Sequence, residues 1–303
     1  LIALKNKLGK WIIGPATVGG IVPGAFKIGN SGGAVSNLIM SKLFKSGSVG
    51  FVSKSGGMLN EMAHVASLNS DGLYEGVAIG GDKFPAAFDA PSEANPFLGW
   101  RSIRVCLDQP EIFRPQLRAI LRAAADRRIQ VMLPLITRVD EVERAREMLA
   151  EEAADLERAG VRAARQLPVG VMVETPAAVM IADRLAKVSS FFSVGTNDLT
   201  QYALAVDRGN AHLASRFTPH DPAILRMLRD VLAAGNTQGI PVSVCGEMAS
   251  EPLYAVLLFG LGFTALSVAP PALPLLKWLV RSVPMTVARA AANAALEASG
   301  PDE

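Results

Sequence analysis

Three polar residues directly end or follow apolar runs, where their side chains could act together on a charged ligand. Glu174 ends the run VGVMVE, and Asn197 and Asp198 follow the run FFSVGT. Two carboxylates at neighbouring strand ends can hold a hard cation such as Mg²⁺, which prefers oxygen ligands and keeps positions for water and substrate. Asn197 and the nearby Arg208 could then hold a carboxylate and a phosphate. These residue types suit a phosphoryl-transfer site.

Each of these residues also has an ordinary structural interpretation. Glu174 and Asp198 could cap the helices that follow them by accepting hydrogen bonds from the first backbone amides. Asn197 is of a type common in turns, and a single arginine such as Arg208 usually carries a solvated surface charge. Because these residues cluster at the ends of predicted strands, we favour a shared site.

The elements that must position these residues follow a regular rhythm from Ser48 onward. Short β-branched or apolar runs alternate with longer helical patterns, which is typical of βα units around a parallel sheet. The predicted strands cover 48–53, 75–80, 102–107, 129–135, 169–174, 191–196, 241–246 and 263–269. Eight units predict an α/β fold, a closed (β/α)₈ TIM barrel whose catalytic groups lie at the carboxyl ends of the strands. An open doubly wound sheet is the alternative.

The clearest helical pattern runs from about residue 140 to residue 158. Its apolar residues fall on one stripe, namely Val142, Ala145, Leu149 and Leu156. Thr137 and Asp140 form a capping-box signature at its start. Arg114 lies in an earlier helical stretch, where we expect its side chain to face solvent.

Composition is that of a globular protein with a sizeable core. Half of the 303 residues are apolar, and 30 basic side chains nearly balance 28 acidic ones. Such a balance gives no long-range field for nucleic acid or an anionic membrane. Only Cys106 and Cys245 occur, no run of 18 apolar residues is present, and the first residues lack a signal-peptide core. We therefore expect a cytoplasmic protein without disulfides.

Four longer motifs resemble one family over residues 87–303. NPFLGWRSIR, VMVETPAA, FFSVGTNDLTQYALAVDRGN and VCGEMAS are similar to the barrel domain of phosphoenolpyruvate-protein phosphotransferases, enzyme I of the bacterial sugar phosphotransferase system. The resemblance implies a Mg²⁺-dependent transferase that passes a phosphoryl group from phosphoenolpyruvate (PEP) to a histidine on a partner domain or carrier protein and releases pyruvate. It also implies a homodimer.

The same resemblance implies a role for each residue of the predicted site. Glu174 and Asp198 would bind Mg²⁺. The residues that would hold PEP are Arg101, Asn197 and Arg208. Cys245 would protonate the enolate of pyruvate, a step that a thiol at a strand end can perform. The alternative for a lone cysteine is a small buried hydrophobe.

Residues 12–83 resemble a different family, the ATP-citrate lyases and the α subunit of succinyl-CoA synthetase. The matching stretches are IIGPATVGGIVPGAFKIGNSGG, SVGFVSKSGGMLNEM and DGLYEGVAIGGDKFP. That resemblance implies a turn that binds a phosphate through backbone amides at a helix start, formed by Lys54, Ser55 and Gly56. An ordinary βα turn with a serine cap is the other interpretation.

The two resemblances meet at IGGDK (79–83), a string that both families contain. The chain therefore looks like a chimera of an incomplete ligase-like segment, 1–86, and a barrel domain, 87–303. We expect the runs at 48–53 and 75–80 to supply the first two barrel strands, which puts Glu75 where enzyme I has a phosphate-binding arginine. Acyl-CoA or citrate chemistry and an inactive barrel that only binds ligand or dimerises are the alternatives.

Overall fold

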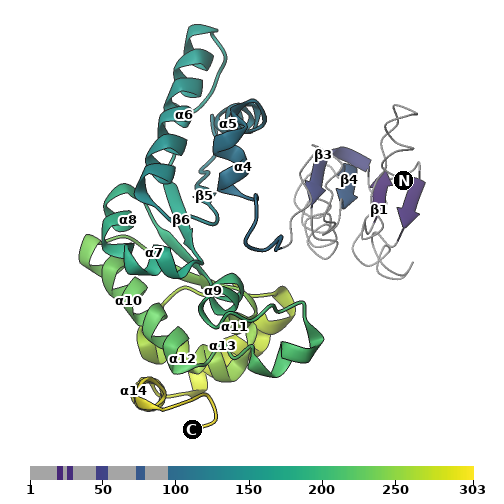
Figure 1. Ribbon diagram of the computed structural model, residues 1–303. Coiled ribbons are helices and arrows are strands. Elements are labelled where there is room, and N and C mark those ends of the chain that lie inside the picture. Colours follow the sequence, from purple (N-terminus) through teal and green to yellow (C-terminus); the bar gives the residue numbers. More distant parts are fainter. Residues whose placement is uncertain (1–18, 23–25, 30–45, 54–72, 79–94) are drawn as a thin grey trace. The chain divides into compact units, whose positions relative to one another are not determined.

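The computed structural model describes residues 95–303 and four strands ahead of them, at 19–22, 26–29, 46–53 and 73–78 (Figure 1). The chain divides into two compact units, Leu1–Trp100 and Arg101–Glu303. The predicted domain boundary between 86 and 87 stays a prediction. Among the described residues, no helix combines the length and apolarity needed to cross a bilayer.

The first unit contains a sheet with mixed strand directions, here called the mixed sheet. Its strands are β1 (Gly19–Val22), β2 (Phe26–Gly29), β3 (Ser46–Ser53) and β4 (Leu73–Ala78), in the order β2-β1-β4-β3. β3 and β4 are parallel, whereas β1 is antiparallel to both β4 and β2. β4 is hydrogen-bonded along both edges, so neither edge remains for a third barrel strand. This corrects the expectation that β3 and β4 open the barrel.

The second unit contains a sheet whose strands are all parallel, here called the parallel sheet. Its strands, adjacent in chain order, are β5 (Val131–Leu133), β6 (Val169–Val173), β7 (Phe192–Gly195) and β8 (Val242–Cys245). β7 is buried throughout and β6 at all but one residue, as expected for parallel strands covered on both faces. These strands confirm four of the predicted runs, and their carboxyl ends meet at one edge.

The predicted strand at 102–107 is wrong, because this run forms helix α4 (Ile103–Asp108). Its apolar residues fit either period, since Ile103 and Leu107 are four residues apart and share a helical face. Ile103 is 1% exposed, and Leu107 packs against the same core. A short apolar run does not decide between helix and strand by periodicity, and here packing against other helices decides.

The predicted strand at 263–269 is reduced to a single bridge. Leu266 pairs in parallel with Val244 of β8. The amide of Val244 donates to the carbonyl of Ala265 at 3.1 Å, and the amide of Ser267 donates to the carbonyl of Val244 at 2.8 Å. This segment therefore lies along the outer edge of β8, but with too few bonds to count as a strand.

Helices connect the parallel strands in the manner of βα units (Figure 1). Those that begin after a strand of the parallel sheet are α6 (Val139–Arg158), α7 (Pro176–Met180), α8 (Ala182–Val188), α9 (Thr196–Ala203) and α11 (Glu247–Ser250). The others are α5 (Pro110–Ala123), α10 (Pro222–Gln238), α12 (Pro252–Leu261), α13 (Leu273–Ser282), α14 (Met285–Glu297) and the 3₁₀ turns η1 (Ala211–Arg216) and η2 (Pro270–Ala272). Proline starts several of them, because its missing amide costs no hydrogen bond there.

Helix α6 confirms the predicted helix, and all four residues of its apolar stripe are buried. The cap differs from the prediction by one residue. Glu141, not Asp140, accepts the amides of Thr137 at 2.7 Å and Arg138 at 2.9 Å. Asp140 instead pairs with the side chain of Arg138.

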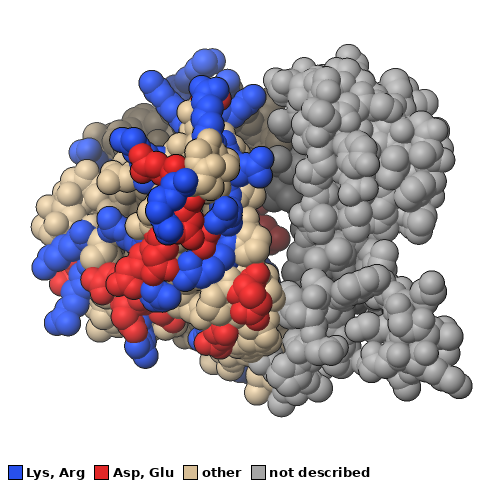
Figure 2. Space-filling model, turned by 90° about the horizontal axis from the view of Figure 1, so that it is seen from above, with Lys and Arg blue, Asp and Glu red and all other residues tan. Residues whose placement is uncertain are grey.

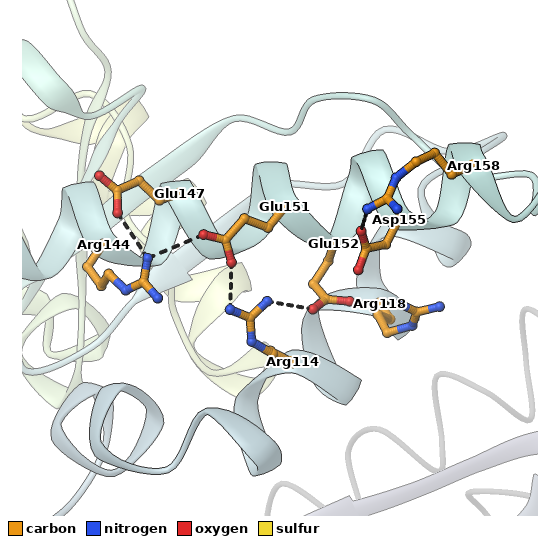
Figure 3. A network of polar contacts seen from close by, with 8 residues as sticks. All are labelled: Arg114, Arg118, Arg144, Glu147, Glu151, Glu152, Asp155 and Arg158. Atoms are coloured by element: carbon orange, nitrogen blue, oxygen red, sulfur yellow. Dashed lines mark hydrogen bonds and ion pairs between the residues drawn. The ribbon is translucent and has the colours of Figure 1, made fainter.

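Ion pairs fasten α5 to α6 (Figure 3). Arg114 donates to Glu151 at 2.5 Å and to Glu152 at 2.8 Å, and Arg118 donates to Glu152 at 2.9 Å. Glu152 is only 3% exposed, so its charge requires these two guanidinium groups. The expectation that Arg114 simply faces solvent is therefore wrong. On the face of the molecule seen in Figure 2, acidic and basic side chains lie side by side.

Candidate active site

The candidate site lies at the carboxyl ends of β6, β7 and β8. Glu174 directly follows β6, Asn197 and Asp198 lie in the first turn of α9 after β7, and Cys245 is the last residue of β8. The register pairs Gly195 with Cys245, so the ends of β7 and β8 are level. The polar side chains of three chain segments therefore start from adjacent positions at one edge.

Glu174 is a buried carboxylate next to charged neighbours. Its side chain is 6% exposed, and its Oε1 accepts the amide of Leu135 at 2.7 Å. Leu135 adopts φ 57°, a left-handed conformation uncommon for leucine, just after β5. The pKa of the Glu174 carboxyl is raised to about 7, chiefly by burial. The Leu135 hydrogen bond, Arg101 and Arg208 lower this pKa, and the charge of Asp198 raises it.

Asp198 joins two arginines from separate parts of the chain. Its Oδ2 lies 3.2 Å from Arg101, which precedes α4, and its Oδ1 lies 3.5 Å from Arg208, in the loop after α9. Asp198 is 7% exposed, whereas both arginines are partly exposed. Arg101 also donates to the hydroxyl of Tyr202 at 3.3 Å. One buried carboxylate thus holds two guanidinium groups at the carboxyl edge of the parallel sheet, the edge where its strands end.

Asn197 connects the ends of β7 and β8. Its Oδ1 accepts the amide of Glu247 at 3.2 Å, and the hydroxyl of Thr196 donates to the carbonyl of Cys245 at 3.0 Å. Gly246 between them adopts φ 107°, and a Cβ there would lie 2.4 Å from the Thr196 hydroxyl. Only glycine suits this position, because both the backbone conformation and the contact exclude a side chain.

Cys245 carries a thiol that is held on both sides. The hydroxyl of Ser193 donates to Sγ at 3.4 Å, and Sγ donates to the carbonyl of Val194 at 3.3 Å. Burial raises the pKa of the Cys245 thiol, the Ser193 hydrogen bond lowers it, and the charge of Glu174 raises it again. The net shift is upward, so at neutral pH the sulfur carries its proton.

Glu174 and Asp198 fit a divalent cation on electrostatic grounds. Both carboxylates are buried, and the charge of Asp198 opposes ionisation of Glu174, a repulsion that a bound cation would remove. A Cβ on Gly195 would lie 2.8 Å from Glu174 Oε2, so glycine leaves room at this oxygen. Among the described residues, no group of three or more His, Cys, Asp or Glu side chains is arranged to hold a metal ion. Water and substrate oxygens would complete the coordination.

The structure brings together the six residues predicted for metal binding, PEP binding and proton transfer. The predicted phosphate turn, Lys54, Ser55 and Gly56, lies outside the described residues. Sequence reasoning overlooked contributions from Ser193, Gly246 and Tyr202. A signal for two of them is their place in predicted strands, since Ser193 lies within the run at 191–196 and Gly246 is the last residue of the run at 241–246.

Comparison with known proteins gives a family match over most of the chain. Residues 74–285 match the family model described as PEP-utilising enzyme, PEP-binding domain. The chain is 43% identical over 205 residues to a phosphoenolpyruvate-protein phosphotransferase of Staphylococcus carnosus, which covers 68% of this chain and 36% of that protein. The namesake of Haemophilus influenzae is 42% identical over 219 residues, covering 72% of this chain and 38% of that protein. The chain thus spans little more than a third of these relatives.

A solved ATP citrate lyase from Methanosaeta concilii is 32% identical, over 58% of this chain and 23% of that one, with a TM-score of 0.28. This TM-score is too low to show a shared fold for the ligase-like segment. The PEP-binding domain of the matched family is a (β/α)₈ barrel of the PEP/pyruvate type, and the parallel sheet with its helices has the corresponding α/β organisation. Because the match covers more than half of its residues, the chain belongs to the PEP-utilising enzymes through their PEP-binding domain.

Proposed function

We propose that the site at the carboxyl edge of the parallel sheet binds PEP and, with Mg²⁺, transfers its phosphoryl group to a histidine on a partner domain or carrier protein. The observation that carries the proposal is the pairing of Arg101 and Arg208 with the buried Asp198 beside Glu174. Two cationic and two anionic groups at one strand edge suit a ligand that is itself highly charged. The family and the named relatives support PEP as that ligand.

The binding residues divide the charges of PEP among them. Guanidinium groups match the geometry of phosphate oxygens, so Arg101 and Arg208 would hold the phosphoryl group. The side-chain amide of Asn197 would hold the carboxylate of PEP. Glu174 and Asp198 would hold Mg²⁺, which when bound neutralises charge on the transferring group.

Cys245 would complete the reaction by moving one proton. Loss of the phosphoryl group from PEP breaks the bond between phosphorus and the enol oxygen and leaves the enolate of pyruvate. The Cys245 thiol is protonated at neutral pH and would give this proton to C3 of the enolate, which forms pyruvate. The resulting thiolate regains a proton from solvent. Hydrogen bonds with Ser193 and Val194 orient Sγ for this step.

The phosphoryl acceptor would be a histidine outside the described site. Of the described histidines, His220 stacks on Tyr254 with ring centroids 5.0 Å apart, and His212 lies exposed in η1. A histidine-bearing partner and a homodimer of the chain both follow from the enzyme I resemblance. We also propose that the protein is cytoplasmic and that the chain is a chimera whose first unit comes from the ligase-like family.

Isothermal titration of the full chain with PEP in the presence of Mg²⁺ tests the proposal. We expect saturable binding that is lost when EDTA removes the metal. Parallel titrations with citrate and with coenzyme A test the ligase alternative and should give no heat of binding. Binding of citrate or coenzyme A without binding of PEP would overturn the proposed function.

A further inference from the structure

The backbone of the loop that carries Arg208 is hydrogen-bonded to Gln201 of helix α9. The main-chain carbonyl of Gln201 accepts the amide of Val206 at 3.0 Å, and its side-chain Oε1 accepts the amide of Arg208 at 3.1 Å. Gln201 is 5% exposed, so its side of these bonds is buried. The loop backbone therefore meets Gln201 at two points before it reaches the Arg208 side chain.

The loop also has a defined path on either side of these bonds. Ala205 adopts φ 55°, the left-handed conformation that turns the chain sharply after α9. Beyond Arg208, the carboxylate of Asp207 accepts the amide of Gly209 at 2.7 Å. A turn at a non-glycine residue costs conformational energy, which contacts around it must offset. The hydrogen bond to Gln201 is such a contact.

Helix α9 thus holds Arg208 at both ends. Asp198 and Gln201 lie three residues apart and so on one face of the helix. Asp198 contacts the guanidinium group at 3.5 Å, and Gln201 holds the backbone amide. Arg208 is thus contacted by α9 at its backbone amide and at its guanidinium group.

The other end of the glutamine amide indicates why this residue type is present. Gln201 Nε2 is buried and has no hydrogen-bond partner among the described residues. An unpaired buried donor destabilises a fold, so leucine would suit the burial better. The advantage of an amide at this position therefore lies in its oxygen. Among the described residues, that oxygen bonds only to the amide of Arg208.

We infer that Gln201 is a positioning residue, which sets Arg208 in place for the phosphate of PEP. The inference rests on the proposed function for its substrate. The hydrogen bond between Gln201 and the Arg208 amide does not depend on PEP. The two parts can therefore be tested separately.

The test uses three variants of the full chain. Gln201→Leu removes both amide atoms, and Gln201→Glu keeps the acceptor oxygen but buries a charge. Thr200→Val is the matched control, because Thr200 is also buried and its hydroxyl has no partner in the described part of the chain. Hydrogen exchange of the Arg208 amide by NMR should become roughly threefold to tenfold faster in Gln201→Leu, the effect of one lost neutral hydrogen bond, and stay unchanged in Thr200→Val.

Affinity for PEP separates positioning from a purely structural role. Stability should fall most in Gln201→Glu, because it buries a charge, whereas PEP affinity should fall roughly threefold to tenfold in Gln201→Leu and less in Gln201→Glu. In an Arg208→Ala background the effect of Gln201→Leu on affinity should vanish. Unchanged Arg208 exchange in Gln201→Leu overturns the inference. If Gln201→Leu speeds Arg208 exchange as expected but the wild-type chain binds no PEP, the proposed function fails and the hold of Gln201 on the loop stands.

Discussion

The mixed sheet and the parallel sheet each have four strands, but they differ in where the carboxyl ends of those strands lie. In the mixed sheet β1 runs against both of its neighbours, so the carboxyl ends of its strands fall at opposite edges. In the parallel sheet all carboxyl ends fall at one edge, where Glu174, Asp198 and Cys245 gather. Strand direction, more than strand composition, therefore decides where charged groups can converge.

The largest expected effect contrasts the two cysteines. Cys106 and Cys245 are both partly buried, and burial raises the thiol pKa of each, but only Cys245 lies at the carboxyl edge of the parallel sheet. Cys245→Ala should slow deuterium exchange at the methyl group of pyruvate, with Mg²⁺ in D₂O, by roughly 100-fold or more, the range for a lost general acid. Cys106→Ala should leave it unchanged. Equal rates in the two variants, followed by NMR, would remove Cys245 from the mechanism.

Glu174 should make stability depend on pH. Its folded-state pKa of about 7 lies above the ordinary value of 4.5, so the folded chain binds the extra proton and the free energy of unfolding falls as pH rises from 4.5 to 7. In metal-free buffer, Glu174→Gln should raise the free energy of unfolding at pH 8 by about 3 kcal/mol at most, and hardly at pH 4.

Urea unfolding at both pH values measures this difference. The exposed Glu143 on α6 gives a control for the change from carboxylate to amide at a solvated position, and Glu143→Gln should not reproduce the gain in stability of Glu174→Gln at pH 8. Mg²⁺ at pH 8 should stabilise the wild type and not Glu174→Gln. A difference between wild type and Glu174→Gln that is the same at both pH values is incompatible with a raised pKa.

A smaller effect contrasts arginines inside and outside the site. Arg208→Ala should weaken PEP binding roughly 10-fold to 100-fold, the range for a lost hydrogen bond to a charged group. The exposed Arg184 on α8 is the appropriate control, because Arg114 pairs with the buried Glu152 and its loss would destabilise the fold. Titration calorimetry with PEP measures both. Equal affinities would show that Arg208 is an ordinary surface charge.

The smallest effect concerns the mixed sheet. Alignment with enzyme I alone predicts that Glu75→Arg strengthens PEP binding, because Glu75 would face the phosphate. β4, which contains Glu75, is instead paired on both edges within the mixed sheet. We therefore expect no change in PEP affinity. A gain measured by the same calorimetry would return β4 to the barrel.

Local pattern was enough to predict the parallel sheet and the polar residues at its edge. β5 to β8 are short apolar runs bounded by turn signals. Glu174 directly follows β6, and Asp198 lies three residues after the end of β7. Helix α6 was equally clear, because its apolar stripe extends over several turns. In these segments the sequence pattern and the tertiary contacts demand the same structure.

Tertiary contacts decided where prediction failed. The run at 102–107 satisfies both periods, and packing made it α4. Pairing of β4 with β1 is a long-range choice that no local signal in EGVAIG encodes. Gln201 could not be recognised from sequence, because its importance depends on a bond to a loop whose turn at Ala205 has no glycine to announce it.

Binding of Mn²⁺ followed by electron paramagnetic resonance tests the central claim most directly, because it reports on the carboxyl edge of the parallel sheet. We predict that the wild-type chain binds the ion, that PEP alters its spectrum, and that Asp198→Asn loses both effects. Asp183→Asn on α8, an exposed acid outside the site, should behave as wild type. Mn²⁺ binding by Asp198→Asn with wild-type affinity and an unchanged response to PEP would contradict the account.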